Sequence, residues 1–213
     1  MQEKTIRVFL KHYIMKKIIL SAVVMLASVA GYAQHEVGTV TIQPKVGLNV
    51  ATLTNYDKAD PRFGVAAGAE LEYQLTDIVS LSAGALYSMQ GYKTSVSQGK
   101  ISITNTHKVD YVNVPVMCNV YVVNGLAVKL GVQPGFKVNS KNDFKANTIL
   151  GKASESFDMK AKSVDFSIPV GLSYEYRNLV LDARYNFGVT KVFENSDTKN
   201  SVFQFTLGYK FEL

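Results

Sequence analysis

The sequence predicts an all-β protein, an eight-stranded antiparallel up-and-down transmembrane β-barrel. Three observations predict this fold. Apolar and polar residues alternate with a period of two through most of residues 38–213. The connections between these segments are alternately short and long. No run of apolar residues reaches the roughly 18 to 20 that a membrane-spanning helix needs. The 213 residues amount to one domain.

Residues 1–33 are predicted to form a secretory signal peptide, which leaves 34–213 as the barrel domain. Lys16 and Lys17 precede a 13-residue apolar stretch, Ile18–Ala30. Small residues at Gly31 and Ala33 then fit a cleavage site. Met15 is an alternative start, because the pattern of an export signal begins there.

Composition excludes several classes of protein. Hydrophobic residues make up 47% of the chain, too many for a disordered protein. Cys118 is the single cysteine, which excludes an internal disulfide and a cysteine-built zinc site. No phosphate loop, dinucleotide fingerprint or metal-ligand spacing occurs, so we expect neither a cofactor nor a metal. Residues 34–213 carry 18 basic and 16 acidic residues, a net charge of +2, and this weak charge predicts no nucleic-acid partner.

Eight segments show the alternation that defines the predicted strands. In the first, Val46 and Leu48 alternate with Lys45, Gly47 and Asn49, so one face is apolar and the other polar. A closed ring of such strands leaves no exposed edge. The segments are 40–50, 63–73, 79–88, 112–122, 126–137, 164–176, 179–189 and 203–213.

The connections predict which end of the barrel faces which compartment. Short turns are expected near 75–78, at Asn124-Gly125 and at Arg177-Asn178. Long loops are expected at 51–62, 93–107, 140–162 and 190–200. Short turns at one rim and long loops at the other are typical of outer-membrane barrels, with the long loops at the cell surface.

Alternation alone leaves two orientations of the apolar face. A soluble periplasmic barrel would bury it around an apolar ligand, whereas a membrane barrel would show it to lipid. The polar face mixes both signs of charge, which a small lumen holds only when the charges pair. We therefore predict an ion-paired, plugged lumen, with a narrow pore as the alternative. Its predicted network comprises Lys45, Glu70, Glu72, Lys129, Lys137, Asp165, Glu175, Asp182, Arg184, Lys210 and Glu212.

Aromatic residues and strand length also favour the membrane orientation. A strand of about eleven residues, tilted by about 40°, rises about 28 Å, close to the roughly 25 Å apolar band of such barrels. Aromatic residues gather at strand ends, where they would form interfacial girdles. The predicted girdle residues are Phe63, Tyr73, Tyr87, Phe136, Phe166, Tyr174, Tyr176, Phe187, Phe203, Tyr209 and Phe211.

Four prolines fall within the predicted strands and cannot donate to the backbone ladder. Pro115 and Pro169 each follow a long loop, and we expect them near the outer rim. Pro44 and Pro134 lie inside the first and fifth segments.

Several short stretches together resemble the PorT-like outer membrane protein beta-barrel domain family, a group of porin-family small barrels of Gram-negative bacteria. They are residues 45–49 (KVGLN), 111–116 (YVNVPV), 181–188 (LDARYNFG) and 207–211 (LGYKF). The resemblance implies a protein of the outer membrane with eight strands, and by analogy a component of a protein secretion system. Tyr209, Phe211 and Leu213 resemble the signal read by the barrel-insertion machinery.

No catalytic constellation is predicted, so we expect a non-catalytic protein. His107 and Asp110 precede a strand at the long-loop side, but spacing along a loop provides no geometry for a relay. The Glu70 and Glu72 pair is better explained by ion pairing in the lumen.

The loop 140–162 is the predicted working surface, because lysines and aromatic residues interleave along it. It would meet lipopolysaccharide phosphates or a protein partner, beside the outer-membrane lipid that surrounds the barrel. The role expected is structural, binding or assembly at the cell surface. The loop's candidate residues are Lys141, Phe144, Lys145, Lys152, Phe157 and Lys160.

Overall fold

The computed structural model describes residues 35–54, 59–98, 101–148, 151–158, 162–192 and 197–213. The predicted signal peptide lies outside these residues. Within them, no helix has the length and apolar character needed to cross a membrane. The chain forms β-strands: β1 (Val40–Leu53), β2 (Asp60–Thr76), β3 (Val79–Gln98), β4 (Ile101–Asn113), β5 (Val116–Val123), β6 (Leu126–Thr148), β7 (Gly151–Asp158), β8 (Val164–Tyr176), β9 (Leu179–Lys191), β10 (Lys199–Tyr209) and β11 (Phe211–Glu212).

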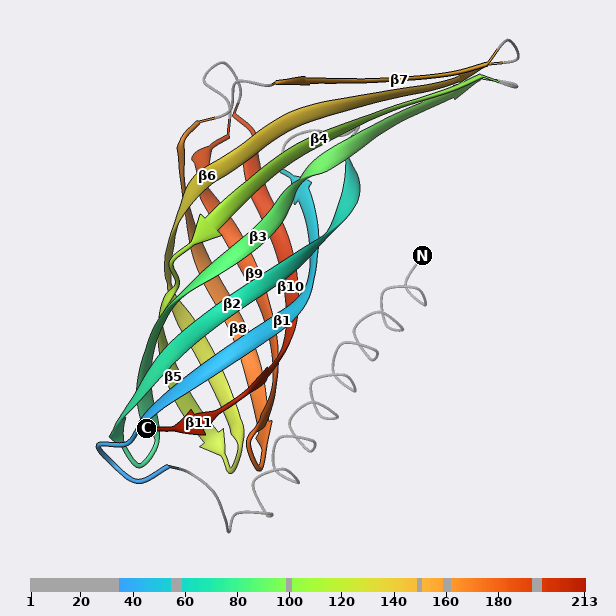
Figure 1. Ribbon diagram of the computed structural model, residues 1–213. Coiled ribbons are helices and arrows are strands. Elements are labelled where there is room, and N and C mark those ends of the chain that lie inside the picture. Colours follow the sequence, from blue (N-terminus) through green and yellow to red (C-terminus); the bar gives the residue numbers. More distant parts are fainter. Residues whose placement is uncertain (1–34, 55–58, 99–100, 149–150, 159–161, 193–196) are drawn as a thin grey trace, which may run out of the picture.

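The sheet closes into a ring of eight positions, which confirms the predicted barrel (Figure 1). Neighbouring strands are antiparallel, and β1 closes the ring by pairing with β10 from Lys45↔Gly208 to Leu53↔Asn200. β4 and β5 share one position between β3 and β6, β11 continues β10 along β1, and β7 pairs with β6. Closure pairs the two edge strands of the sheet with each other, so their backbone N–H and C=O groups are satisfied without water.

The fourth predicted strand is interrupted at Val114-Pro115, which separates β4 from β5. The nitrogen of Val114 donates to the carbonyl of Pro134, and the carbonyl of Pro115 accepts from Gly84. Because proline has no N–H, the strand is interrupted here, but its register against both neighbours is unchanged, as the pairs Leu86↔Asn113 and Ala83↔Val116 show for β3. Pro115 therefore lies within the wall, beside Gly84, and the expectation that it marks the outer rim is wrong.

The apolar face of the barrel points outward. Leu48 is 58% exposed and Leu181 60%, whereas Lys45 is 4% exposed and Arg184 2%. A water-soluble protein shows the opposite distribution, with apolar side chains inside and charges outside. The alternative of a soluble periplasmic barrel is therefore wrong.

Four strands continue past the ring as a sheet extension, formed by the distal parts of β3, β4 and β6 together with β7 (Figure 1). β6 pairs with β4 out to Ser102↔Asn147 and with β7 out to Thr148↔Gly151. The predicted loops 93–107 and 140–162 are thus largely strand. The sequence did not predict these strands, because both of their faces carry polar residues. Alternation of apolar and polar residues arises where one face of a strand meets an apolar environment, and neither face of the extension does.

Candidate functional site

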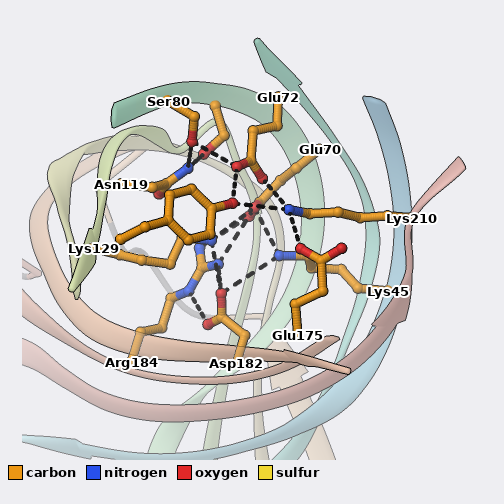
Figure 2. A network of polar contacts seen from close by, with 12 residues as sticks. Lys45, Glu70, Glu72, Ser80, Asn119, Lys129, Glu175, Asp182, Arg184 and Lys210 are labelled. Atoms are coloured by element: carbon orange, nitrogen blue, oxygen red, sulfur yellow. Dashed lines mark hydrogen bonds and ion pairs between the residues drawn. The ribbon is translucent and has the colours of Figure 1, made fainter. Parts of the chain in front are cut away.

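The centre of the lumen holds five charged side chains in mutual contact, here called the central cluster: Lys45, Glu70, Lys129, Asp182 and Arg184 (Figure 2). Arg184 donates to Glu70 Oε1 at 3.0 Å and to both oxygens of Asp182 at 2.7 and 2.8 Å. Lys45 Nζ lies 2.7 Å from Glu70 Oε2, and Lys129 Nζ lies 2.9 Å from Asp182 Oδ2. All five residues are buried.

Strand alternation and two glycines make room for the central cluster. Each member lies at a lumen-facing position, so the side chains of four strands converge. A side chain at Gly84 would place its Cβ 2.7 Å from the side chain of Glu70. A Cβ at Gly171 would lie at the same distance from the Cβ of Arg184. Glycine at these two positions therefore leaves space for long charged side chains in a narrow ring.

A second group, the inner cluster, surrounds Lys210 (Figure 2). It lies toward the short-turn rim, where the backbone nitrogen of Lys210 donates to the carbonyl of Asn178. Lys210 Nζ is 2.8 Å from Glu175 Oε2 and 3.0 Å from Glu72 Oε2, and donates to Tyr121 Oη at 3.1 Å. Glu72 also accepts from Tyr121 and Ser80, each at 2.6 Å. The two clusters together contain four cations and four carboxylates, so the buried charge is balanced.

His35 ties the segment before β1 to the inner cluster. Its Nε2 lies 3.2 Å from Glu175 Oε1, and its Nδ1 lies 3.8 Å from Glu212 Oε2. The hydrogen bond with Glu175 raises the pKa of His35 above its ordinary value, against the opposing effect of burial. Glu212 was predicted inside the lumen, but its side chain is 64% exposed at the rim, because β11 reaches the end of β1.

We expect the stability of the barrel to fall as pH rises past neutrality, through His35. A pKa raised by folding adds stability that is complete below the unfolded value of about 6.5 and is lost above the folded value. Unfolding midpoints measured from pH 5 to 9 should show this decline, and His35→Asn should flatten it. His107→Asn serves as the control and should leave the decline in place. An unchanged profile in His35→Asn would contradict the contact.

An outer cluster that sequence reasoning missed surrounds Asp110. Arg62 Nη1 lies 3.1 Å from Asp110 Oδ1 and also donates to the carbonyl of Gln90. Tyr87 Oη and Asn139 Nδ2 donate to Asp110 Oδ2 at 3.2 and 3.0 Å. Arg62 lies in a segment that was predicted to be a loop. Its position just before a predicted strand was the one sequence feature that could have indicated its role.

His107 and Asp110 do not form a relay. They are three positions apart on one strand, so their side chains leave from opposite faces. His107 stacks on Tyr92 with ring centroids 4.3 Å apart, while Asp110 contacts Arg62, Tyr87 and Asn139. Across the described ranges, no three His, Cys, Asp or Glu side chains gather to hold a metal ion.

The two remaining predicted lumenal charges lie nearer the outer rim. Asp165 is buried at the start of β8 and accepts from Thr190 Oγ1 at 2.9 Å. Lys137 is half-buried opposite Tyr111. A bulge between Asp110 and Tyr111 shifts the register of β6 at this level, and beyond it the extension begins.

The predicted girdle residues lie on the outer face, exposed except for the half-buried Phe166. Tyr73, Tyr174, Tyr176, Tyr209 and Phe211 lie near the short turns, and the others lie toward the extension. Tyr185 was not predicted, yet it packs against Phe187 and Phe203 at ring distances of 4.2 and 4.5 Å. Cys118 is exposed on the same face.

The predicted surface loop is placed on the sheet extension. Lys141, Phe144 and Lys145 lie on β6, and Phe157 lies on β7. Lys152 belongs to the backbone of β7, and Lys160 lies outside the described residues. Lys141 and Lys145 are an even number of residues apart and so share one face of β6. Phe144 is an odd number of residues from each of them, so its side chain leaves from the opposite face.

A closed ring with an apolar outside and an ion-paired inside defines a small β-barrel protein of the outer membrane. The sequence profile of a family described as outer membrane protein beta-barrel domain matches residues 32–194, and the chain belongs to this family. No curated protein sequence matches the chain.

The chain is similar, at low identity, to several solved structures of outer-membrane barrels. Ail, the attachment invasion locus protein of Yersinia pestis, is 16% identical over 83% of this chain and 100% of Ail, with a TM-score of 0.44. Neisserial surface protein A is 12% identical over 81% of this chain and 97% of its own, with a TM-score of 0.43. OprG from Pseudomonas aeruginosa is 12% identical over 83% and 97%, with a TM-score of 0.40.

Proposed function

We propose that this protein is a non-catalytic binding or assembly component at the surface of a Gram-negative outer membrane. The sheet extension carries the proposal, because it continues four strands past the outer aromatic girdle (Figure 1). A structure of hydrogen-bonded strands holds side chains at fixed spacing, as a recognition surface requires.

One face of the extension is basic, and this supports an anionic partner. Lys108 lies opposite Lys141, while Lys93 and Lys145 lie opposite threonines of β4, and the registers place all four on one face. By register, three carboxylates share this face: Asp143 pairs with Lys108, Asp60 lies opposite Lys93, and Asp158 lies opposite Lys141. Lys152, opposite Asn147, lies on the same face. Five lysines against three carboxylates leave an excess of positive charge.

The basic face continues the lipid-facing side of β3 and β4, where Tyr87 and Val112 lie opposite each other. It therefore begins just beyond the outer girdle, at the depth of the outer-leaflet headgroups. Phosphate groups of lipopolysaccharide are the anions at this depth, and lysine is a common phosphate ligand. We infer that lipopolysaccharide is one partner, with a protein partner on the remaining surface of the extension.

The charged lumen supports a closed barrel over a narrow pore. Four cations and four carboxylates span it in direct contact, and an eight-stranded ring has little room beyond its side chains. A role in protein secretion, implied by the PorT-like resemblance, stays a prediction, as does recognition of Tyr209, Phe211 and Leu213 by the insertion machinery.

Reversing charge on the basic face should separate binding from folding. We expect the double variant Lys141→Glu/Lys145→Glu to reduce binding of immobilised lipopolysaccharide at least tenfold, because it turns two ligands of phosphate into repelling charges. The matched control Lys191→Glu/Lys199→Glu changes the same charge on β9 and β10 and should bind normally. Equal loss in both variants would reduce the effect to net charge and contradict the assignment.

Planar-bilayer recordings of the unmodified protein should show no steady conductance, and a stable salt-dependent current would contradict the closed lumen.

A further inference from the structure

We propose that the outer wall of the barrel binds one anionic phospholipid of the periplasmic leaflet, with an acyl chain in a groove across β8, β9 and β10 and the phosphate at Arg177. The site lies at the short-turn end of the barrel. It is therefore separate from the lipopolysaccharide site proposed above, which lies on the extension, and either site can fail without the other.

The groove is a hollow of about 530 Å³ in the lipid-facing wall. Ala183 forms its floor, because this small residue lies opposite the larger Phe205 of β10 and opposite Leu172 of β8. Every outward-facing residue that lines the groove is apolar or aromatic, as an acyl chain requires. A hollow of this size falls within the range of about 300 to 1,000 Å³ that small-molecule sites occupy.

The groove runs from the short-turn rim to the middle of the wall. Leu126 and Tyr174 pair with each other at its rim end, next to the turns Asn124-Gly125 and Arg177-Asn178, which lie side by side (Figure 1). Val46 lies at its other end, halfway between the two girdles. This extent matches an acyl chain of a single leaflet. The short-turn side of an outer-membrane barrel faces the periplasm, and phospholipids make up that leaflet.

Arg177 places a positive charge at the rim end of the groove. Its guanidinium carbon lies 5.6 Å from the ring centroid of Tyr176, the outward-facing residue that precedes it on the turn. Glu175, the nearest carboxylate along β8, pairs with Lys210 in the lumen, so the exposed guanidinium is available to a phosphate.

The backbone at Arg177 also indicates a role for this side chain. Its φ of 56° lies in the left-handed region that favours glycine, and the adjacent turn has Gly125 at a φ of 75°. A side chain that holds an unfavourable backbone conformation is more often functional than structural. Asn178 fixes the turn in place, since its Nδ2 donates to the carbonyl of Lys210.

Charge determines which phospholipid occupies the groove. Hydrocarbon surrounds the whole wall, so an acyl chain gains little free energy by moving from the bilayer into the groove. An arginine at headgroup depth attracts a lipid with a net negative charge more strongly than a zwitterionic one. On the opposite side of the ring, the turn that follows Tyr73 carries Asp77 instead of a basic residue.

The test measures contact between lipid and a single fluorescent reporter. The chain has no tryptophan, so Tyr176→Trp provides a unique signal beside the groove, and Tyr73→Trp provides a reference across the ring. Each variant is refolded into phosphatidylcholine vesicles that contain increasing fractions of phosphatidylglycerol brominated in its acyl chains, because bromine quenches nearby tryptophan. We expect phosphatidylglycerol to bind about fivefold more strongly than phosphatidylcholine beside the groove, the preference that one basic side chain near a membrane surface provides. The reference should show no such preference.

Two further substitutions in the Tyr176→Trp protein separate charge from shape. Arg177→Gln should remove the preference, and Ala183→Leu, which fills the floor of the groove, should reduce it at least twofold. Ala85→Leu enlarges an outward-facing alanine on β3 and is the matched control, which should retain the preference. All three positions are exposed, so the variants should fold, as the electrophoretic shift of the folded barrel would show.

Three results would overturn the proposal. Equal preference at both reporters would assign the attraction to the overall charge of the barrel. A preference that persists in Arg177→Gln would place the phosphate elsewhere. A preference that Ala183→Leu leaves unchanged would place the acyl chain outside the groove.

Discussion

Replacing Arg184 with alanine should destabilise the barrel by about 3 to 5 kcal/mol, the cost of breaking a buried ion pair from one side. Arg184 provides three short hydrogen bonds to Glu70 and Asp182, at 2.7 to 3.0 Å. Without the guanidinium, two carboxylates share Lys45 and Lys129 in a site closed to water. Across the central and inner clusters, three cations then face four carboxylates, and this uncompensated negative charge adds to the loss of the three hydrogen bonds.

The measurement is the urea midpoint of the protein refolded in detergent micelles, followed by the electrophoretic shift between folded and unfolded chains. Arg184→Lys should fall between the wild type and Arg184→Ala, because it keeps the charge but loses the planar fork that reaches both carboxylates. Lys191→Ala is the matched control, since Lys191 forms an exposed pair with Asp197. Exposed pairs contribute little, so its midpoint should not move. An unchanged midpoint in Arg184→Ala would show that the central cluster does not hold the strands together.

A lysine placed at Val46 should cost about 2 to 4 kcal/mol, the penalty for a cation near the middle of the lipid-facing side of a barrel. Val46 points outward on β1, halfway between the position paired with Phe211 and the position paired with Phe203. The ammonium group would have to enter hydrocarbon or bend toward a headgroup, and both arrangements oppose folding into a bilayer.

Val37 provides the control for that experiment. Val37 and Val46 are both 56% exposed, but Val37 precedes β1 at the short-turn rim. Val37→Lys should therefore leave the unfolding midpoint in lipid vesicles unchanged. If both variants lost the same stability, the outer face would not meet hydrocarbon, and the orientation of the barrel would have to be reversed. Exposure alone does not distinguish the two sites, so a difference between them reports the surrounding medium.

The periodicity of the chain predicted the fold because side-chain direction in a strand depends only on parity. Lys45, Glu70, Asp182 and Arg184 could be assigned to one face without any knowledge of their neighbours. The same rule failed in the extension, where residues such as Thr104, Asn105 and Lys145 carry no contrast between faces. It also missed the break at Pro115, since the apolar positions on both sides keep their spacing.

The sequence by itself determined an all-β chain, the short turns at Asn124-Gly125 and Arg177-Asn178, and the two faces of each strand. These are local properties, set by alternation over a few residues and by turn chemistry. The tertiary structure alone decided that Arg184 contacts Glu70, 114 positions away, and that Arg62 contacts Asp110. Those contacts depend on the stagger of strands around a closed ring, and stagger follows from the register of all eight positions together.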